Sequence, residues 1–197
     1  MLTSLRKDTY RHLQLGPGMF LKNFPWENAQ TAEELKSLLA EALLSGEYLI
    51  GATRGGGTFQ CKPEIRRIDA DGSRYADKSA TLNDCWTVKL TGTLLEITPE
   101  GFASALMGAE VTTEGSITTL RVKTDLWENS FIPRLCWVGD TSQGFALIEL
   151  KNALNVAGVT FSFGDKGEGT LPFEYQAHTD GEDDYAPFSL VFLEGGK

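Results

Sequence analysis

The chain has 197 residues, which is enough for one domain with a sizeable apolar core and too few for two complete domains. Its 27 acidic and 18 basic residues give a formal net charge of -9, and this argues against nucleic-acid binding because phosphate contacts need a basic surface. The sequence shows neither a signal-peptide pattern nor an apolar run of about 18 residues. We therefore expect a protein that is made and kept in the cytoplasm, without a membrane anchor.

The first 30 residues have no regular period, because a Gly-Pro-Gly sequence at 16–18 and Pro25 interrupt it. This segment also holds several scattered aromatic side chains. We interpret residues 1–30 as an N-terminal arm that covers its apolar groups by packing on its own domain or on a neighbouring subunit. Residues 31–197 are then expected to form the main domain.

Two short segments have the start signals of helices. Residues 31–46 begin with Thr31 and Glu34 at the spacing of a capping box, continue with an apolar stripe and end at a glycine. A second, shorter helix is predicted after Thr98 and Pro99, because proline suits the first helical turn. We expect these one or two α-helices to flank a sheet.

Most of the remaining sequence alternates apolar and polar residues with the period of two that a strand requires. This period predicts that Trp86, Val88 and Leu90 face a core, while the residues between them face water or a lumen. The predicted strands cover 47–53, 58–70, 85–98, 117–124, 131–138, 145–150 and three C-terminal segments. The sequence therefore predicts a mainly β fold, an antiparallel β-sandwich or partly closed barrel whose open edges can pair with another subunit.

A long polar, glycine-rich segment, residues 55–81, separates two of these strands. Asp71-Gly72 is a hairpin-turn signal, and the flanking segments 59–62 and 65–68 can run out and back. Long segments of this kind serve either as contact loops or as ordinary surface loops. The residues alone leave both interpretations open.

The C-terminal sequence resembles the C-terminal half of bacteriophage tail tube (major tail) proteins. The residues that show this resemblance are Phe145–Asn155, Gly158–Gly164, Thr170–His178 and Tyr185–Phe192. The resemblance extends over residues 48–192 and consists of a pattern of strands and turns. It implies a structural subunit, with no enzyme activity and no cofactor, that forms hexameric rings stacked into a hollow conduit for genome delivery.

The same resemblance implies a location and a set of partners. The subunit would be assembled in the host cytoplasm and would belong to the tail of the virion. Its partners would be further copies of itself and other tail proteins such as the tape measure, the initiator and the terminator, while DNA passes through without specific binding. The extended segment 55–81 would reach an adjacent subunit.

The distribution of charge suggests where two subunits meet. Residues 54–89 hold seven basic and five acidic side chains, whereas residues 160–197 hold two basic and eight acidic ones. Such patches can meet across an interface, where they set register more than affinity; equally, both can be solvated faces. The predicted contact-loop residues are Arg54, Phe59, Arg66, Arg67, Arg74 and Lys78. The predicted acidic partner patch consists of Asp180, Glu182, Asp183 and Asp184.

No catalytic, cofactor-binding or metal site is predicted. Residues 51–58 have the outline of a phosphate-binding loop, but Gly57 stands where its lysine is needed, so we interpret these glycines as conformational. Residues 139–144 have one residue too many before Ser142 for a nucleophile elbow, and we interpret them as a turn. The acidic segment 178–184 lacks calcium-loop spacing. Buried free thiols are expected at Cys61, Cys85 and Cys136.

Two alternative functions fit the sequence. The inner tube of a contractile injection or secretion particle would share the fold and much of the function. A monomeric β-sandwich carbohydrate-binding module would also have many strands, no catalytic residues and aromatic side chains such as Trp86, Trp127 and Trp137. Self-assembly distinguishes the first from the second.

Overall fold

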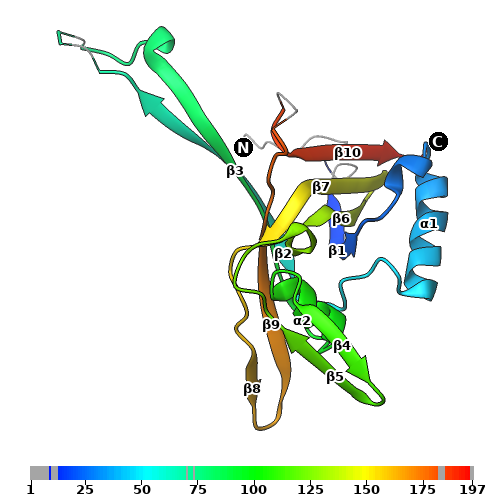
Figure 1. Ribbon diagram of the computed structural model, residues 1–197. Coiled ribbons are helices and arrows are strands. Elements are labelled where there is room, and N and C mark those ends of the chain that lie inside the picture. The colour runs from blue at the N-terminus through cyan, green and yellow to red at the C-terminus, as the bar shows by residue number, and fades with distance from the viewer. Residues whose placement is uncertain (1–8, 10–12, 70, 73, 182–184, 196–197) are drawn as a thin grey trace.

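A computed structural model describes residues 9, 13–69, 71–72, 74–181 and 185–195 (Figure 1). These residues form an antiparallel eight-stranded sheet, a small two-stranded sheet and two α-helices. The mainly β, antiparallel fold with flanking helices is therefore confirmed. The large sheet does not close into a barrel.

Two α-helices interrupt the series of strands, one after β1 and one after β3. The strands are β1 (Gln14–Lys22), β2 (Thr53–Arg67), β3 (Thr81–Leu94), β4 (Glu110–Glu114), β5 (Ile117–Arg121), β6 (Ile132–Thr141), β7 (Gly144–Asn155), β8 (Ser162–Gly164), β9 (Gly167–Gln176) and β10 (Phe188–Glu194). The helices are α1 (Ala32–Ser45) and α2 (Pro99–Ala105). The large sheet runs β1-β6-β7-β9-β3-β2, with β10 on β7 and β8 on β9, and the small sheet is β4-β5.

Strand β7 joins two halves of the large sheet. Most of its length pairs with β6 and β10, and its last two residues, Leu154 and Asn155, pair with β9. One apolar core contains buried side chains from both halves, including Phe20, Leu90, Leu135, Leu150, Phe173 and Tyr175. A second core includes α1 and the strands β1, β6 and β7, with Leu21, Leu35, Leu39, Cys136 and Leu147. The first core thus holds the two halves of the sheet together, and the second holds α1 against the half that contains β1, β6 and β7.

Helix α1 forms where the sequence predicts it. The Thr31 hydroxyl accepts a hydrogen bond from the Glu34 amide at 3.2 Å, which satisfies one free donor of the first turn. The Glu34 carboxylate accepts from the Gln30 amide instead of the Thr31 amide, so the reciprocal half of the capping box is shifted by one residue. Gly46, at φ 70°, ends the helix in the left-handed conformation.

Helix α2 also forms where the sequence predicts it. The Thr98 hydroxyl accepts from the Gly101 amide at 3.0 Å, and Pro99 occupies the first turn. Beyond the helix, Gly108 adopts φ 70°, and a Cβ there would lie 1.9 Å from the carbonyl oxygen of Asn129. Only glycine allows this close approach, which brings the end of α2 against the segment before β6.

Strand β1 lies within the segment that we interpreted as an N-terminal arm. It pairs with β6, and the register breaks between Leu15 and Met19, where Pro17 sits between two glycines of positive φ. An irregularity of this kind lets an edge strand accept a proline. Phe20 and Phe24 are each 1% exposed. Phe20 and Phe24 are therefore covered by the domain of the same chain, which is one of the two alternatives we considered, whereas Tyr10 lies outside the described residues.

Other details differ from the sequence prediction. Residues 1–8 and 10–12 of the predicted arm lie outside the described residues. The predicted strand at 47–53 is reduced to one bridge, between Leu49 and Leu21, before β2 begins. Strand β4 was not predicted, because its sequence has no apolar alternation and all five residues are exposed.

Strands β2 and β3 form a hairpin whose far end projects away from the body of the molecule (Figure 1). The predicted turn signal Asp71-Gly72 lies in the connection between them. Both predicted flanks, 59–62 and 65–68, belong to the outgoing side of the hairpin, and the returning side is β3. We call residues 62–88 the distal hairpin.

Candidate functional site

The distal hairpin continues an apolar stripe that begins in the core. Phe59, Cys61 and Pro63 lie on one face of β2 because they alternate along the strand, and Pro63 is paired with Trp86. Phe59 and Cys61 pack against the first core, and Val88 of the paired strand is fully buried. Trp86, two residues further out, is 48% exposed. The prediction that Trp86 faces a core is therefore wrong for the single chain.

The reason for this change is the length of the hairpin relative to its neighbours. Strand β9 pairs only with Lys89–Leu94 of β3. Beyond that point β3 has no strand partner except β2 among the described residues. Several large apolar side chains of the distal hairpin are consequently exposed: Ile65, Ile68, Tyr75, Leu82 and Trp86. Exposed apolar area of this extent is typical of a surface that contacts another molecule.

The six predicted contact-loop residues lie along this one hairpin, but they do not form one group. Arg54 is at its base, with its guanidinium 3.0 Å from the Glu168 carboxylate. Phe59 is part of the body, where its ring centroid lies 5.5 Å from that of Phe188. The other four belong to the distal hairpin: Arg66, Arg67, Arg74 and Lys78.

Two of these four cations are paired within the chain. The Arg66 guanidinium donates to both oxygens of Asp84, at 2.7 and 3.1 Å, which connects the two strands. The side-chain hydrogen bond from Arg66 lowers the pKa of Asp84 below its usual range. Arg67 lies 3.0 Å from Asp69. Both pairs are exposed, so we expect them to fix the hairpin's shape and contribute little stability.

The other cations of the distal hairpin have no such partner. Lys62, Arg74 and Lys78 have no carboxylate within 4.0 Å among the residues that the structure describes. The predicted acidic partner patch cannot be placed opposite them, because only Asp180 of its four members lies within the described residues. The other three members, residues 182–184, lie outside them.

A groove with unpaired carboxylates runs beside helix α2. It consists of two adjoining hollows of about 460 and 310 Å³ that share Lys22, Glu100 and Ser104. Its other lining residues include Glu47, Glu96, Glu110, Val111, Trp127 and Ile132. None of its four glutamates has an ion-pair partner within 4.0 Å in the described part of the chain. We call this surface the α2 groove. This groove was not predicted, because its residues come from four separate segments of the chain.

The edge of the sheet at β10 is a third surface suited to contact with another molecule, because it combines an unpaired strand edge in the described residues with exposed apolar side chains. All seven residues of β10 pair with β7 in unbroken register. The strand contains no proline, lysine or bulge, and Leu190 and Phe192 are 49% and 72% exposed. Natural edge strands usually carry one of those protective features. Among the described residues the other edge of β10 pairs with no strand, and this free edge is therefore suited to pairing with another strand.

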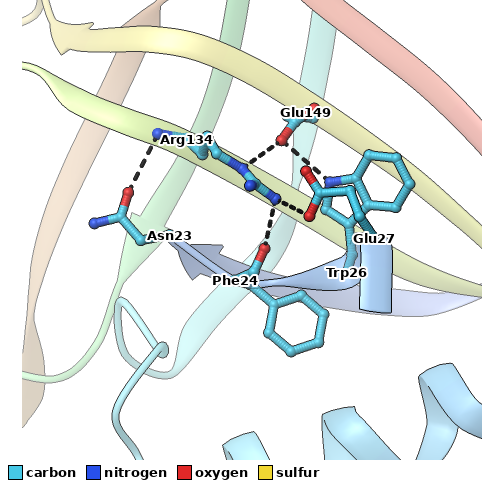
Figure 2. Close-up of polar contacts among 6 residues, drawn as sticks. All are labelled: Asn23, Phe24, Trp26, Glu27, Arg134 and Glu149. Atoms are coloured by element: carbon cyan, nitrogen blue, oxygen red, sulfur yellow. Dashed lines mark hydrogen bonds and ion pairs between the residues drawn. The ribbon is translucent and has the colours of Figure 1, made fainter. Parts of the chain in front are cut away.

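A polar cluster on β6 and β7 is saturated by contacts within the chain (Figure 2). The Arg134 Nε donates to Glu149 at 2.8 Å, and its Nη2 donates to the Phe24 carbonyl at 3.0 Å and to the Glu27 carboxylate. The indole of Trp26 donates to the same Glu149 oxygen at 3.1 Å. Glu149 is only 6% exposed, and these bonds compensate its burial. The cluster fastens the segment before α1 to the sheet.

The motifs that we set aside as non-catalytic have structural roles. Gly55 and Gly56 adopt φ 78° and 73° at a register break of β2, which confirms that these glycines serve conformation. Ser142 lies in the tight turn between β6 and β7, which confirms the predicted turn. His178 Nδ1 lies 3.2 Å from the Asn152 carbonyl. Among the described residues, no three or more His, Cys, Asp or Glu side chains form a group that could hold a metal ion.

The three cysteines are unpaired, but they are not all buried. Cys136 is fully buried, and burial raises the pKa of its thiol to about 12. Cys85 is exposed on the distal hairpin, which contradicts our expectation, because it alternates with Trp86 and so lies on the face of β3 opposite Val88 and the core. Its thiol lies 2.9 Å from the Glu64 carboxylate, and this hydrogen bond raises the pKa of Cys85.

The chain matches no protein-family model and no curated protein. No helix in the described ranges is long and apolar enough to span a membrane. Function is therefore inferred from the resemblance of the C-terminal strands and from the three surfaces described above.

Proposed function

We propose that this protein is the structural subunit of a phage tail tube, in which hexameric rings stack into a hollow conduit for genome delivery. The observation that carries the proposal is the apolar stripe that leaves the core and continues, uncovered, onto the distal hairpin. A single chain exposes Ile65 and Trp86 on this face. A second copy would bury them, and apolar burial stabilises association by about 25 cal/mol per Å² before the costs of binding.

The free edge of β10 supports the same proposal. This edge and the distal hairpin lie on different parts of the molecule (Figure 1). In this proposal each of them meets a different surface of the next subunit, so the contacts are heterologous. Heterologous contacts produce rings where the rotation closes and filaments where it does not. In a tube of stacked rings, the contacts within a ring close, and the contacts between rings repeat along the tube axis.

The net charge is consistent with a conduit for DNA. Each subunit has a formal net charge of -9, and a ring multiplies that charge. An acidic lumen repels phosphates, which favours sliding of DNA over binding. In this proposal the partners are further copies of the chain and other tail proteins, and no cofactor takes part.

The β10 edge provides a test with a matched control. Leu190→Lys with Phe192→Lys places two charges on the free edge, where the native side chains are largely exposed, so the fold should survive and self-association should be lost. Leu43→Lys with Leu44→Lys adds the same charge at similarly exposed positions of α1, 54% and 89%, and should assemble normally. Sedimentation velocity and negative-stain microscopy measure the difference. Equal assembly of the two variants would contradict a role for β10.

The inner tube of a contractile injection particle remains an alternative, because the same surfaces would serve it. The carbohydrate-binding module has less support. Trp86, Trp127 and Trp137 lie on separate elements, and the last two donate their indole hydrogens to the carbonyls of Gly108 and Pro17. A monomeric protein that binds glycans, and loses binding on Trp86→Ala, would favour that module.

A further inference from the structure

We propose that the distal hairpin of one copy docks into the α2 groove of a second copy. The inference rests on the proposed function and adds the receiving surface to it. The hairpin presents the apolar face of Ile65 and Trp86, with the cations Arg74 and Lys78 in the connection beyond it and Lys62 on its opposite face. The groove presents apolar walls together with unpaired carboxylates. The occupant of the groove is therefore a second copy of this chain.

The position of the two surfaces excludes a contact within one molecule. Figure 1 shows the distal hairpin pointing away from the body, on a side remote from α1 and α2. A hairpin that reaches a groove must then belong to a different copy. Because the two surfaces are not the same, the contact can repeat head to tail into a ring or filament, whereas a reciprocal exchange of hairpins between two copies would close as a dimer.

The charges of the two surfaces are complementary. Lys62, Arg74 and Lys78 are the cations of the distal hairpin without an ion-pair partner in the described residues. The groove has four carboxylates in the same condition, Glu47, Glu96, Glu100 and Glu110, against one lysine. Charges so arranged attract the correct partner and disfavour a second groove or a second hairpin in its place.

The apolar residues are complementary as well. On the hairpin, Ile65 and Trp86 are 57% and 48% exposed. In the groove, Val111 is 43% exposed and lies with Trp127 and Ile132 along the same hollow. Aromatic and aliphatic side chains surrounded by polar residues are typical of the energetically important centre of an interface. The acidic residues of the groove would form the polar rim.

A charge-reversal cycle tests the contact. Glu96→Lys with Glu100→Lys reverses the groove, and Arg74→Glu with Lys78→Glu reverses the hairpin. Each should raise the protein concentration needed for assembly by about tenfold or more at low salt, and the combined protein should return toward the wild-type value. Glu33→Lys with Glu41→Lys is the matched control, since it reverses two exposed glutamates of α1, one of them in a first helical turn like Glu100.

Disulfide trapping gives a second, independent measurement. In a background with Cys61→Ser and Cys85→Ser, a mixture of a Lys78→Cys protein and a Glu100→Cys protein should form covalent pairs that contain one chain of each. A mixture of Lys78→Cys and Glu41→Cys should not. The two mixtures differ only in whether the second cysteine lies in the α2 groove, at position 100, or on α1, at position 41.

The outcomes separate the inference from the function on which it rests. If the wild-type protein assembles, the β10 variant does not, and groove reversal has no effect, then the docking inference is wrong and the tube subunit stands. If groove and hairpin reversals each weaken assembly and neither rescues the other, the two surfaces do not meet. If the wild-type protein stays monomeric under every condition, both proposals fail.

Discussion

The two ends of the β2–β3 hairpin have the same strands and opposite surroundings. Leu90 and Trp86 lie four residues apart on the same face of β3, yet they are 2% and 48% exposed. Near the body, β9 and β10 supply the side chains that cover this face. Further out, nothing in the described part of the chain covers it. One hairpin thus contributes to folding at its base and leaves apolar side chains uncovered at its end.

The ion pairs of the body and of the distal hairpin also differ in how far they are exposed. In the body, Arg134 contacts Glu149, whose side chain is only 8% exposed. In the distal hairpin, Arg66 contacts Asp84, and both side chains are largely exposed, at 58% and 41%. The first pair includes a buried carboxylate that needs its partner, and the second is solvated with or without it. Polar contacts in the body should therefore affect stability, whereas those in the distal hairpin should affect assembly.

Removal of the distal hairpin should have the largest effect. Lys62 and Thr87 are paired residues, so an Asn-Gly turn in place of residues 63–86 closes the shortened hairpin. Assembly should be lost while the thermal unfolding midpoint changes little, because Phe59, Cys61 and Val88 of the core are retained. Circular dichroism and electron microscopy measure the two properties. An unfolded product would show that the division between base and end is wrong.

Truncation of one residue from each end of the stripe should separate folding from assembly. Leu90→Ala should lower the free energy of unfolding by about 2–5 kcal/mol, the usual cost of a cavity at a buried leucine. Trp86→Ala should change that free energy by about 0.5 kcal/mol or less, as at other surface positions, and should weaken assembly. Urea denaturation and sedimentation give both values. Similar losses of stability in the two variants would remove the distinction between the regions.

The two ion pairs offer a smaller contrast. Arg134→Ala should cost about 1–3 kcal/mol in unfolding free energy, because it leaves the Glu149 carboxylate buried without its cation, while Trp26 still donates to it. Arg66→Ala should leave the unfolding midpoint within experimental error.

Arg66→Ala should nevertheless change a titration. The pKa of Asp84 is lowered by the hydrogen bond from Arg66, so removal of Arg66 should raise that pKa toward its ordinary range. Since the folded-state pKa is the lower one, the pair's small contribution is present above the unfolded-state pKa and is lost as the pH falls through the folded-state value. Carboxyl chemical shifts measured against pH would show whether the two groups interact.

Thiol labelling should show the smallest difference, without any change in the fold. Cys85 is exposed and should react with a maleimide in the native monomer, although the hydrogen bond with Glu64 raises its pKa and slows the reaction. Cys136 should react only after unfolding, because its burial excludes the reagent and also raises its pKa. Mass spectrometry with and without denaturant counts the modified thiols. Rapid labelling of Cys136 in the native protein would contradict the packing of the second core.

Local signals in the sequence predicted much of this fold. Thr31 and Gly46 bound α1, Thr98 and Pro99 start α2, and the alternation near Val88 marks β3, because caps and strand periods act over a few residues. Strand β1 could not be predicted in this way. Its Gly-Pro-Gly sequence reads as a break, and only the irregular pairing with β6 makes it a strand.

The candidate surfaces depended on tertiary structure. The period of two placed Trp86 on the apolar face of β3, but how far β9 extends decides whether that face is covered. The α2 groove joins Lys22, Glu47, Glu96 and Glu110 from segments distant in sequence. No pattern within one segment indicates such a groove. The free edge of β10 likewise appears only when it is known that, in the described part of the chain, this strand pairs with β7 alone.

The most direct test of the central claim, that this chain is a tube-forming subunit, is negative-stain microscopy of the purified wild-type protein at high concentration, with and without a tail initiator complex. The proposal predicts closed rings of uniform diameter, or tubes in which such rings stack, and it predicts that both disappear when residues 63–86 are replaced by a turn. A protein that remains strictly monomeric in both conditions, confirmed by its mass in sedimentation equilibrium, would contradict it.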